Sequence, residues 1–183
     1  MAKIVCLGWG SLIWNSGNLP LQSDWFGDGP SVQVEFARQS KNGRITLVLD
    51  RGAPPVQALW AVMESVNLNA ARHALGDREG ISPKARGRKI GAWPLHEEPL
   101  PGMVLDLPKW AQERDIDGVV WTALSSKFCG EERTPEGKEV VRYLAGLTGE
   151  TRELAEEYVR KAPRQIDTPY RRMIEAALNW PPI

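Results

Sequence analysis

The stretch that decides the fold runs from Lys3 to Gly17 and reads KIVCLGWGSLIWNSG. Its apolar run, Ile4–Leu7, has the pattern of a buried strand. Glycines at positions 8 and 10 then interrupt the run, and apolar residues resume at Leu12. An ordinary tight turn accounts for such an interruption. A loop whose successive backbone N–H groups bind an anion also accounts for it, and a carboxylate is a natural ligand of such a loop.

Length and composition predict an ordinary globular chain. It has 183 residues, of which 42% are hydrophobic and 25% are charged. A chain of this length suits one domain and buries about two-thirds of its unfolded surface, so it needs no metal or disulfide for stability. The 23 basic residues balance the 23 acidic ones. This balance provides no overall field that attracts nucleic acid or a membrane surface, and we expect neither as a partner.

The cysteines and the N-terminus predict a cytoplasmic location. The chain has two cysteines, Cys6 and Cys129, and they do not form a disulfide framework. This low number of cysteines favours a reducing compartment. The apolar run at Ile4–Leu7 is too short for a signal peptide. No apolar run reaches the ~18 residues of a membrane-spanning helix.

Short strands broken by glycine and proline are expected in the first two-thirds of the chain. The pair Asn42-Gly43 lies between two of them and predicts a hairpin with a type I′ turn, in which both central residues have positive φ. The expected strands are Lys3–Leu7, Val32–Arg38, Arg44–Asp50, Val56–Val62, Ile90–Pro94 and Gly118–Thr122.

One helix is expected among these strands, and three after them. The first starts at a cap on Asn67 or Asn69 and ends at Gly76 as its left-handed C′ residue, which places Asp77–Gly80 in the turn beyond. The basic run Pro83–Lys89 is predicted to be a solvated loop. The later helices are expected from Thr134-Pro135 to Leu144, from Thr151 to just before Pro163, and from Thr168-Pro169 to just before Pro181.

The sequence contains no motif for a metal site, for a serine or cysteine nucleophile, or for dinucleotide binding. His73 and His96 have no partners at zinc-ligand spacing, so we predict no metal site. No G-x-S-x-G elbow suggests a serine hydrolase, and Cys129 has no histidine partner at a recognisable spacing. Residues 8–10 lack the third glycine of a dinucleotide fingerprint. The opening loop and the acidic turn around Glu79 remain as candidates.

Taken together, GWGSLIW and the later LWAVMESVNLNAARHALGDREGI resemble the γ-glutamylcyclotransferase-like superfamily. In that family an N-terminal strand ends in a Y-G-S-[LN] loop, and a later strand leads into a short helix that ends in EGV or EGI. The matching positions here are 9–12, 58–62 and 78–81. The hairpin FARQSKNGRITLVL is similar to the glutathione-specific branch. The resemblance extends over about residues 3–125.

The resemblance implies an α+β fold, a function and a set of site residues. The fold would be a single domain over residues 1–183, with a mixed β-barrel over about 1–128 and C-terminal helices over about 129–183 packed outside it. The activity would be cofactor-free release of 5-oxoproline from a γ-glutamyl amine, peptide or amino-acid conjugate. Glu79 matches the family's general acid/base. The substrate-binding positions would be Trp9, Gly10, Ser11, Leu12, Arg38 and Ser40.

Two departures from the family pattern leave the substrate open. Trp9 stands where relatives have tyrosine, which removes a hydroxyl group. The residues after Glu79 are basic, so Arg86 or Arg88 either binds an acidic part of a different substrate or lies in solvent. A non-catalytic protein that binds a small molecule in the same cavity is an alternative. A protein-interaction domain is a third hypothesis, supported only by the eight tryptophans.

Overall fold

The computed structural model describes residues 2–65, 67–94 and 103–183. Within these ranges the chain forms seven strands and six helices. In order they are β1 Ile4–Gly8, β2 Ser31–Gln39, β3 Ile45–Leu49, β4 Pro55–Gln57, β5 Leu59–Val62, α1 Leu68–Arg78, α2 Pro83–Lys89, β6 Ile90–Trp93, α3 Leu107–Gln112, β7 Gly118–Thr122, α4 Gly137–Ala145, α5 Gly149–Lys161 and α6 Pro169–Leu178.

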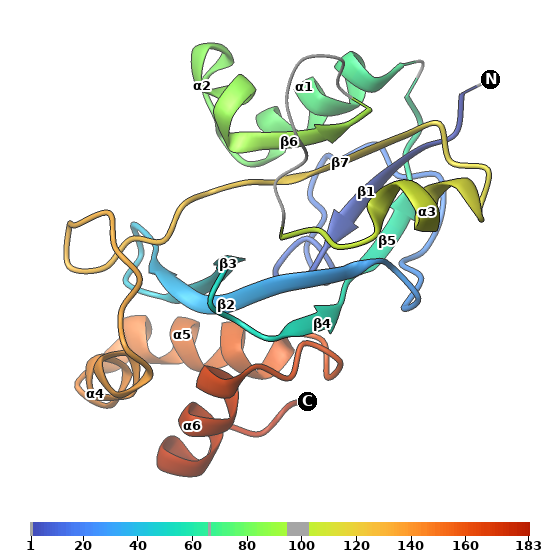
Figure 1. Ribbon diagram of the computed structural model, residues 1–183. Coiled ribbons are helices and arrows are strands. Elements are labelled where there is room, and N and C mark those ends of the chain that lie inside the picture. Colours follow the sequence, from blue (N-terminus) through green and yellow to red (C-terminus); the bar gives the residue numbers. More distant parts are fainter. Residues whose placement is uncertain (1, 66, 95–102) are drawn as a thin grey trace.

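The strands form two sheets (Figure 1). The first has the order β5-β1-β7-β6, with β1 parallel to β7 and antiparallel to β5. The second has the order β3-β2-β4, and both of its strand pairs are antiparallel. The predicted α+β class is therefore confirmed. No closed barrel joins the two sheets within the described ranges.

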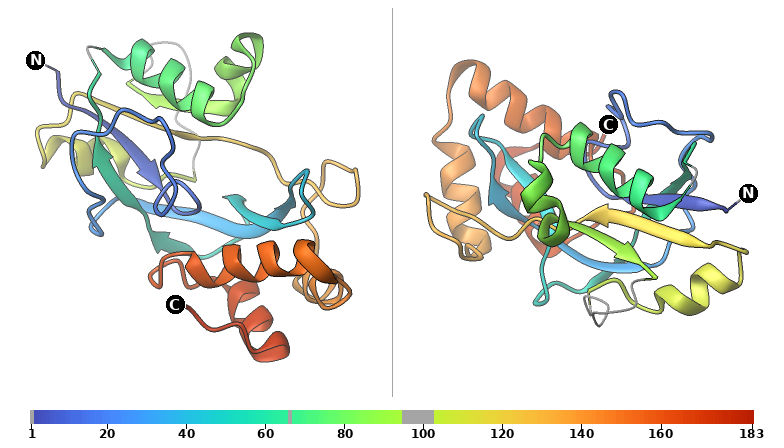
Figure 2. Two further views of the ribbon diagram at one scale, coloured as in Figure 1. Left: turned by 180° about the vertical axis from the view of Figure 1, so that it is seen from behind. Right: turned by 90° about the horizontal axis from the view of Figure 1, so that it is seen from above.

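The run IVCL is apolar throughout because β1 is buried on both faces. Val5 and Leu7 belong to the larger core cluster, together with residues of the second sheet. Ile4 and Cys6 belong to a second cluster, whose other members include buried residues of α1. Successive strand residues point to opposite faces, so one short strand contributes to both clusters. Figures 1 and 2 show α1 and α2 on one side of the first sheet, and α4, α5 and α6 beyond the second sheet.

The C-terminal helices share the larger core with the strands. Val140 of α4, Ala155 of α5 and Ile174 of α6 all belong to the cluster that contains Val5 and Leu7. Within the described ranges, no helix combines the length and the apolar character that crossing a membrane requires.

The segment predicted as one strand over 56–62 is instead two strands in different sheets. β4 pairs with β2, whereas β5 pairs with β1. Between them, the backbone of Ala58 donates to Pro30 and accepts from Gly29. A Cβ at position 29 would collide with the carbonyl oxygen of Ala58, so this close pairing requires glycine. The chain thus passes from one sheet to the other at Ala58.

The β2–β3 hairpin is confirmed, but its turn differs from the predicted type. Only Gly43 has positive φ, at 74°, whereas type I′ needs two such residues. The amide of Gly43 donates to the carbonyl of Ser40 at 3.1 Å, and the amide of Ser40 donates to the carbonyl of Arg44 at 2.8 Å. The connection is therefore a three-residue loop that closes on a left-handed glycine.

Helix α1 extends further than predicted. Asn67 is its N-cap, as expected, and its side chain accepts from the amide of Ala70 at 2.9 Å. Gly76, the predicted C′ residue, lies inside the helix, and the left-handed residue is Gly80 with φ of 64°. The amides of Gly80 and Ile81 donate to the carbonyls of residues 77 and 76, the pattern of a Schellman end. Glu79 is therefore the C-cap residue and not part of a free turn.

Other helices also differ from the prediction. The basic run predicted as a solvated loop is α2, which has proline in its first turn. Helix α3 was not predicted. Helix α4 begins at Gly137, after a capping box between Glu136 and Glu139, and not at Thr134. Helix α5 begins two residues earlier than expected, whereas α6 begins at the predicted Thr168 cap.

Candidate functional site

A cavity of about 170 Å³ lies among the opening loop, β3, the end of α1 and α5. Five of the seven predicted site residues line it: Trp9, Gly10, Ser11, Leu12 and Glu79. Its other lining residues are Arg44, Thr46, Leu47, Val48, Arg78, Thr122, Leu124 and Tyr158.

The opening loop turns sharply after β1. The amide of Ile13 donates to the carbonyl of Gly10 at 3.0 Å, and the amide of Asn15 donates to that of Ser11 at 2.9 Å. These bonds form one turn, and the first N–H groups of such a turn have no acceptor within it. Within the described ranges, the amides of Gly10 and Leu12 donate to no backbone acceptor. Both residues also line the cavity.

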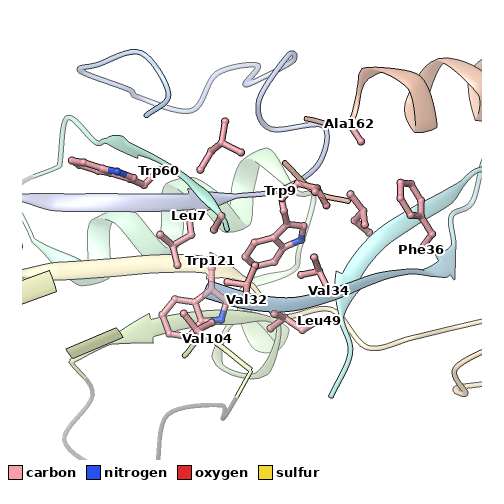
Figure 3. Close-up of a cluster of buried hydrophobic side chains, with 14 of the residues drawn as sticks. Leu7, Trp9, Val32, Val34, Phe36, Leu49, Trp60, Val104, Trp121 and Ala162 are labelled. Carbon is pink, nitrogen blue, oxygen red and sulfur yellow. The ribbon is translucent and has the colours of Figure 1, made fainter. Parts of the chain in front are cut away.

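Trp9 borders both the cavity and the core. It is 3% exposed and belongs to the larger core cluster. Figure 3 shows its indole among the side chains of Leu7, Val32 and Val34. The side chain therefore anchors the start of the loop in the core.

Glu79 lies at the C-terminal end of α1 and is tied to the opening loop through its neighbour Arg78. The two side chains form an ion pair, with Nη1 of Arg78 2.6 Å from Oε1 of Glu79. Nη2 of Arg78 donates to the carbonyl oxygen of Asn15. The side chain of Glu79 is 17% exposed, and its Oε2 has no hydrogen-bond partner among the described residues. One carboxylate oxygen is thus held in place, and the other makes no hydrogen bond to the described residues.

Arg44 contributes a positive charge that pairs with no carboxylate of the described residues. No carboxylate of the described residues lies within 4.0 Å of its guanidinium group, and its Nε is inaccessible to solvent and has no hydrogen-bond partner. Its guanidinium lies over the ring of Tyr158, 5.7 Å from the centroid. Because no described carboxylate neutralises its charge, Arg44 is suited to bind an anionic group.

Tyr158 reaches the cavity from α5. Its hydroxyl accepts a hydrogen bond from the amide of Leu47 at 3.2 Å. A Cβ at Gly10 would lie 2.5 Å from this hydroxyl oxygen, so glycine is required for the close approach of loop and tyrosine. Burial, with a contribution from the charge of Glu79, raises the pKa of Tyr158 to about 12. The phenol therefore stays protonated at neutral pH.

A second cavity, of about 670 Å³, adjoins the first. The two share four lining residues, Ser11, Arg44, Arg78 and Tyr158. The second is also lined by Glu157 and Lys161, which form an ion pair of 2.5 Å with each other. Since Arg78 is paired with Glu79, Arg44 is the unpaired charge at the junction of the cavities among the described residues.

Two predicted site residues do not line these cavities. Nη1 of Arg38 donates to the carbonyl oxygen of Ser125 at 2.6 Å. Ser40 closes the β2–β3 hairpin through its backbone, and its hydroxyl is buried without a partner among the described residues. Arg44, just before β3, and Thr46, within β3, line the first cavity instead.

The remaining candidate groups lie elsewhere or are unreactive. Arg86 pairs with Asp77 and lines neither cavity. Burial raises the pKa of the Cys6 thiol, so Cys6 remains protonated in the core. Cys129 is exposed, and no group of three or more potential metal ligands occurs within the described ranges. His73 is exposed on α1, and His96 lies outside the described residues.

No protein-family model matches the chain, and no curated protein matches it significantly.

Proposed function

We propose that the protein is a γ-glutamylcyclotransferase-like enzyme, which releases 5-oxoproline from a γ-glutamyl amine, peptide or amino-acid conjugate in the cytoplasm. One observation supports this proposal above the others. Glu79 and the loop Gly10–Leu12, which are far apart in the sequence, line one small cavity. The two motifs that carry the family resemblance thus meet in space. In this proposal the two sheets correspond to the family's mixed β-barrel and α4–α6 to its helical extension.

The proposed reaction needs one group that accepts a proton and then returns it. The α-ammonium of the γ-glutamyl group first loses a proton, and the neutral amine attacks the γ-carbonyl carbon. A second proton passes from the attacking nitrogen to Oε2 of Glu79, and from there to the leaving nitrogen. The bond between the γ-carbon and that nitrogen breaks, and the freed amine takes up the proton lost first. General acid–base catalysis of this kind contributes about 10²–10⁴ in rate.

The remaining cavity groups are suited to hold the substrate in a folded conformation. The amides of Gly10 and Leu12 donate to carboxylate or carbonyl oxygens. Arg44 binds a carboxylate of the substrate through its guanidinium group. Ring closure is intramolecular, so fixing the amine against the γ-carbonyl supplies much of the remaining acceleration. No step requires a cofactor.

A panel of γ-glutamyl substrates tests the proposal. Purified protein is incubated with γ-glutamyl amino acids, glutathione and γ-glutamyl amines, and 5-oxoproline is quantified by mass spectrometry. We expect 5-oxoproline and the free amine in equal amounts from at least one substrate. Release of glutamate in place of 5-oxoproline would indicate hydrolysis and contradict the proposed cyclisation.

The Arg44→Gln substitution is predicted to raise KM for the best substrate by about 10- to 100-fold. The reason is the loss of a charge-assisted hydrogen bond worth ~1.5–3 kcal/mol. Steady-state kinetics of 5-oxoproline release measure this effect. Arg51→Gln is the matched control, because Arg51 is exposed and lines neither cavity. Equal KM values for the two variants would remove Arg44 from the binding site.

A non-catalytic binding protein is the second candidate function. The ion pair between Arg78 and Glu79 favours it, because one oxygen of this carboxylate is already engaged by a guanidinium group. A thermal-shift screen with the same γ-glutamyl compounds separates the two functions. A compound that stabilises the protein and is recovered intact after long incubation would favour binding.

A further inference from the structure

Tyr158 lines the cavity but belongs to none of the motifs that carry the family resemblance. It lies on α5, in the C-terminal helices, beyond the region of about residues 3–125 where the resemblance is found. It nevertheless lines both adjoining cavities, and its hydroxyl lies close to Gly10 in the opening loop. The relatives' loop tyrosine is Trp9 here, and Trp9 has no hydroxyl. A hydroxyl thus approaches the loop from a different segment of the chain.

The hydrogen bonds around this hydroxyl leave its proton free. The backbone amide of Leu47 donates to the hydroxyl oxygen, and the amide of Ser11 also lies close enough to lower its pKa through hydrogen bonding. Both amides are donors, so they bind lone pairs of the hydroxyl oxygen and do not engage the hydroxyl proton. No described residue accepts a hydrogen bond from the Tyr158 hydroxyl. The proton is therefore available to an acceptor in the cavity.

The ring of Tyr158 is held in one place. Trp14 packs against it edge-on, with centroids 5.4 Å apart, and Phe36 packs similarly at 6.3 Å. The guanidinium of Arg44 lies over the ring. Tyr158 is 5% exposed, so its surroundings fix the direction of the hydroxyl before a ligand arrives. A donor held in this way needs no reorganisation during a reaction, which is the property of an oxyanion-stabilising group.

We infer that Tyr158 is a catalytic hydrogen-bond donor that binds the γ-carbonyl oxygen of the substrate and takes the place of the hydroxyl missing at Trp9. This inference rests on the proposed function. As the amine attacks the γ-carbon, the carbonyl oxygen gains negative charge, and the hydrogen bond from Tyr158 becomes stronger. When the leaving amine departs, the carbonyl forms again as that of 5-oxoproline. The hydroxyl donates throughout and transfers no proton.

The Tyr158→Phe variant tests this role. Loss of a donor to a developing charge is expected to lower kcat by about 10- to 100-fold and to leave KM within about threefold. Tyr143→Phe is the matched control. The Tyr143 hydroxyl also bonds to the β2–β3 hairpin, donating to the carbonyl of Gly43 at 2.8 Å, but it lines neither cavity. We expect its kcat to equal that of the wild type.

Thermal unfolding of both variants separates catalysis from structure. A purely structural Tyr158 would lower the melting temperature on substitution and leave kcat, measured well below that temperature, unchanged. That result would overturn the inference and leave the proposed function standing. An increase in KM alone would also overturn it. Absence of 5-oxoproline from every substrate with the wild-type protein would overturn the proposed function, and the inference with it.

Discussion

Replacement of Glu79 by glutamine is expected to lower kcat for 5-oxoproline release by about 10²–10⁴-fold, the usual contribution of a general acid–base. Glutamine has nearly the same shape, and its amide oxygen is still able to accept the hydrogen bond from Arg78. It has no group that takes up a proton from the attacking amine. The substitution therefore removes the chemistry while it keeps the contact that links α1 to the opening loop.

Asp77→Asn is the matched control for this experiment. Asp77 lies two residues away on α1, its side chain is 62% exposed, and it lines neither cavity. We expect its kcat to stay within about twofold of the wild type. The rates are measured by mass spectrometry at saturating substrate, with melting temperatures recorded for both variants. Wild-type kcat in Glu79→Gln would remove Glu79 as the general acid–base.

The strands were predictable because their signals are local. The apolar run of β1 reflects the burial of both of its faces. The alternation of apolar and polar residues in β2 likewise reflects which side chains of that strand face the core. The break at Ala58 was not predictable, since it depends on a backbone pairing with Gly29, a residue of another segment. The end of α1 shows a similar limit. Gly76 and Gly80 are both suitable C′ residues in the sequence, and local sequence does not distinguish them; the helix continues through Gly76 and ends at Gly80.

The candidate site was predictable where a motif is contiguous. The Gly10–Leu12 loop and Glu79 belong to such motifs. Leu47 and Tyr158 are separated by 111 residues, and nothing in the pattern of α5 indicates that its inward tyrosine reaches the opening loop. The side-chain direction in β2 was also not predictable. A register shift between Phe36 and Arg38 alters the alternation, and Arg38 contacts Ser125 and not the cavity.

Replacement of Arg171 by methionine is expected to destabilise the protein by about 3–5 kcal/mol, the range for breaking a buried charged network. Arg171 is 1% exposed, and its guanidinium group donates to four carbonyl oxygens at the end of α5 and the segment that follows. These belong to Val159, Ala162, Pro163 and Ile166, at 2.6–3.3 Å. The last carbonyls of a helix lack partners within it, so Arg171 acts as the C-terminal cap of α5.

Methionine fills similar space but leaves these carbonyls buried without donors, each at a cost of about 1–3 kcal/mol where water does not reach. Urea unfolding followed by circular dichroism measures the change in the free energy of unfolding. Arg172→Met is the matched control. The side chain of Arg172 is 66% exposed and pairs with Asp167, so its removal is expected to cost less than about 1 kcal/mol.

Arg171→Lys provides a second test of the same cap. An ammonium group retains the charge but has three donors on one nitrogen, and it does not span four carbonyls as the planar guanidinium does. We expect a destabilisation between those of Arg172→Met and Arg171→Met. Because α5 carries Tyr158 next to Val159, whose carbonyl oxygen Arg171 binds, a loosened end of α5 should also lower kcat for 5-oxoproline release in Arg171→Lys. Equal stabilities of the Arg171 and Arg172 variants would show that the buried guanidinium does not hold α5 in place.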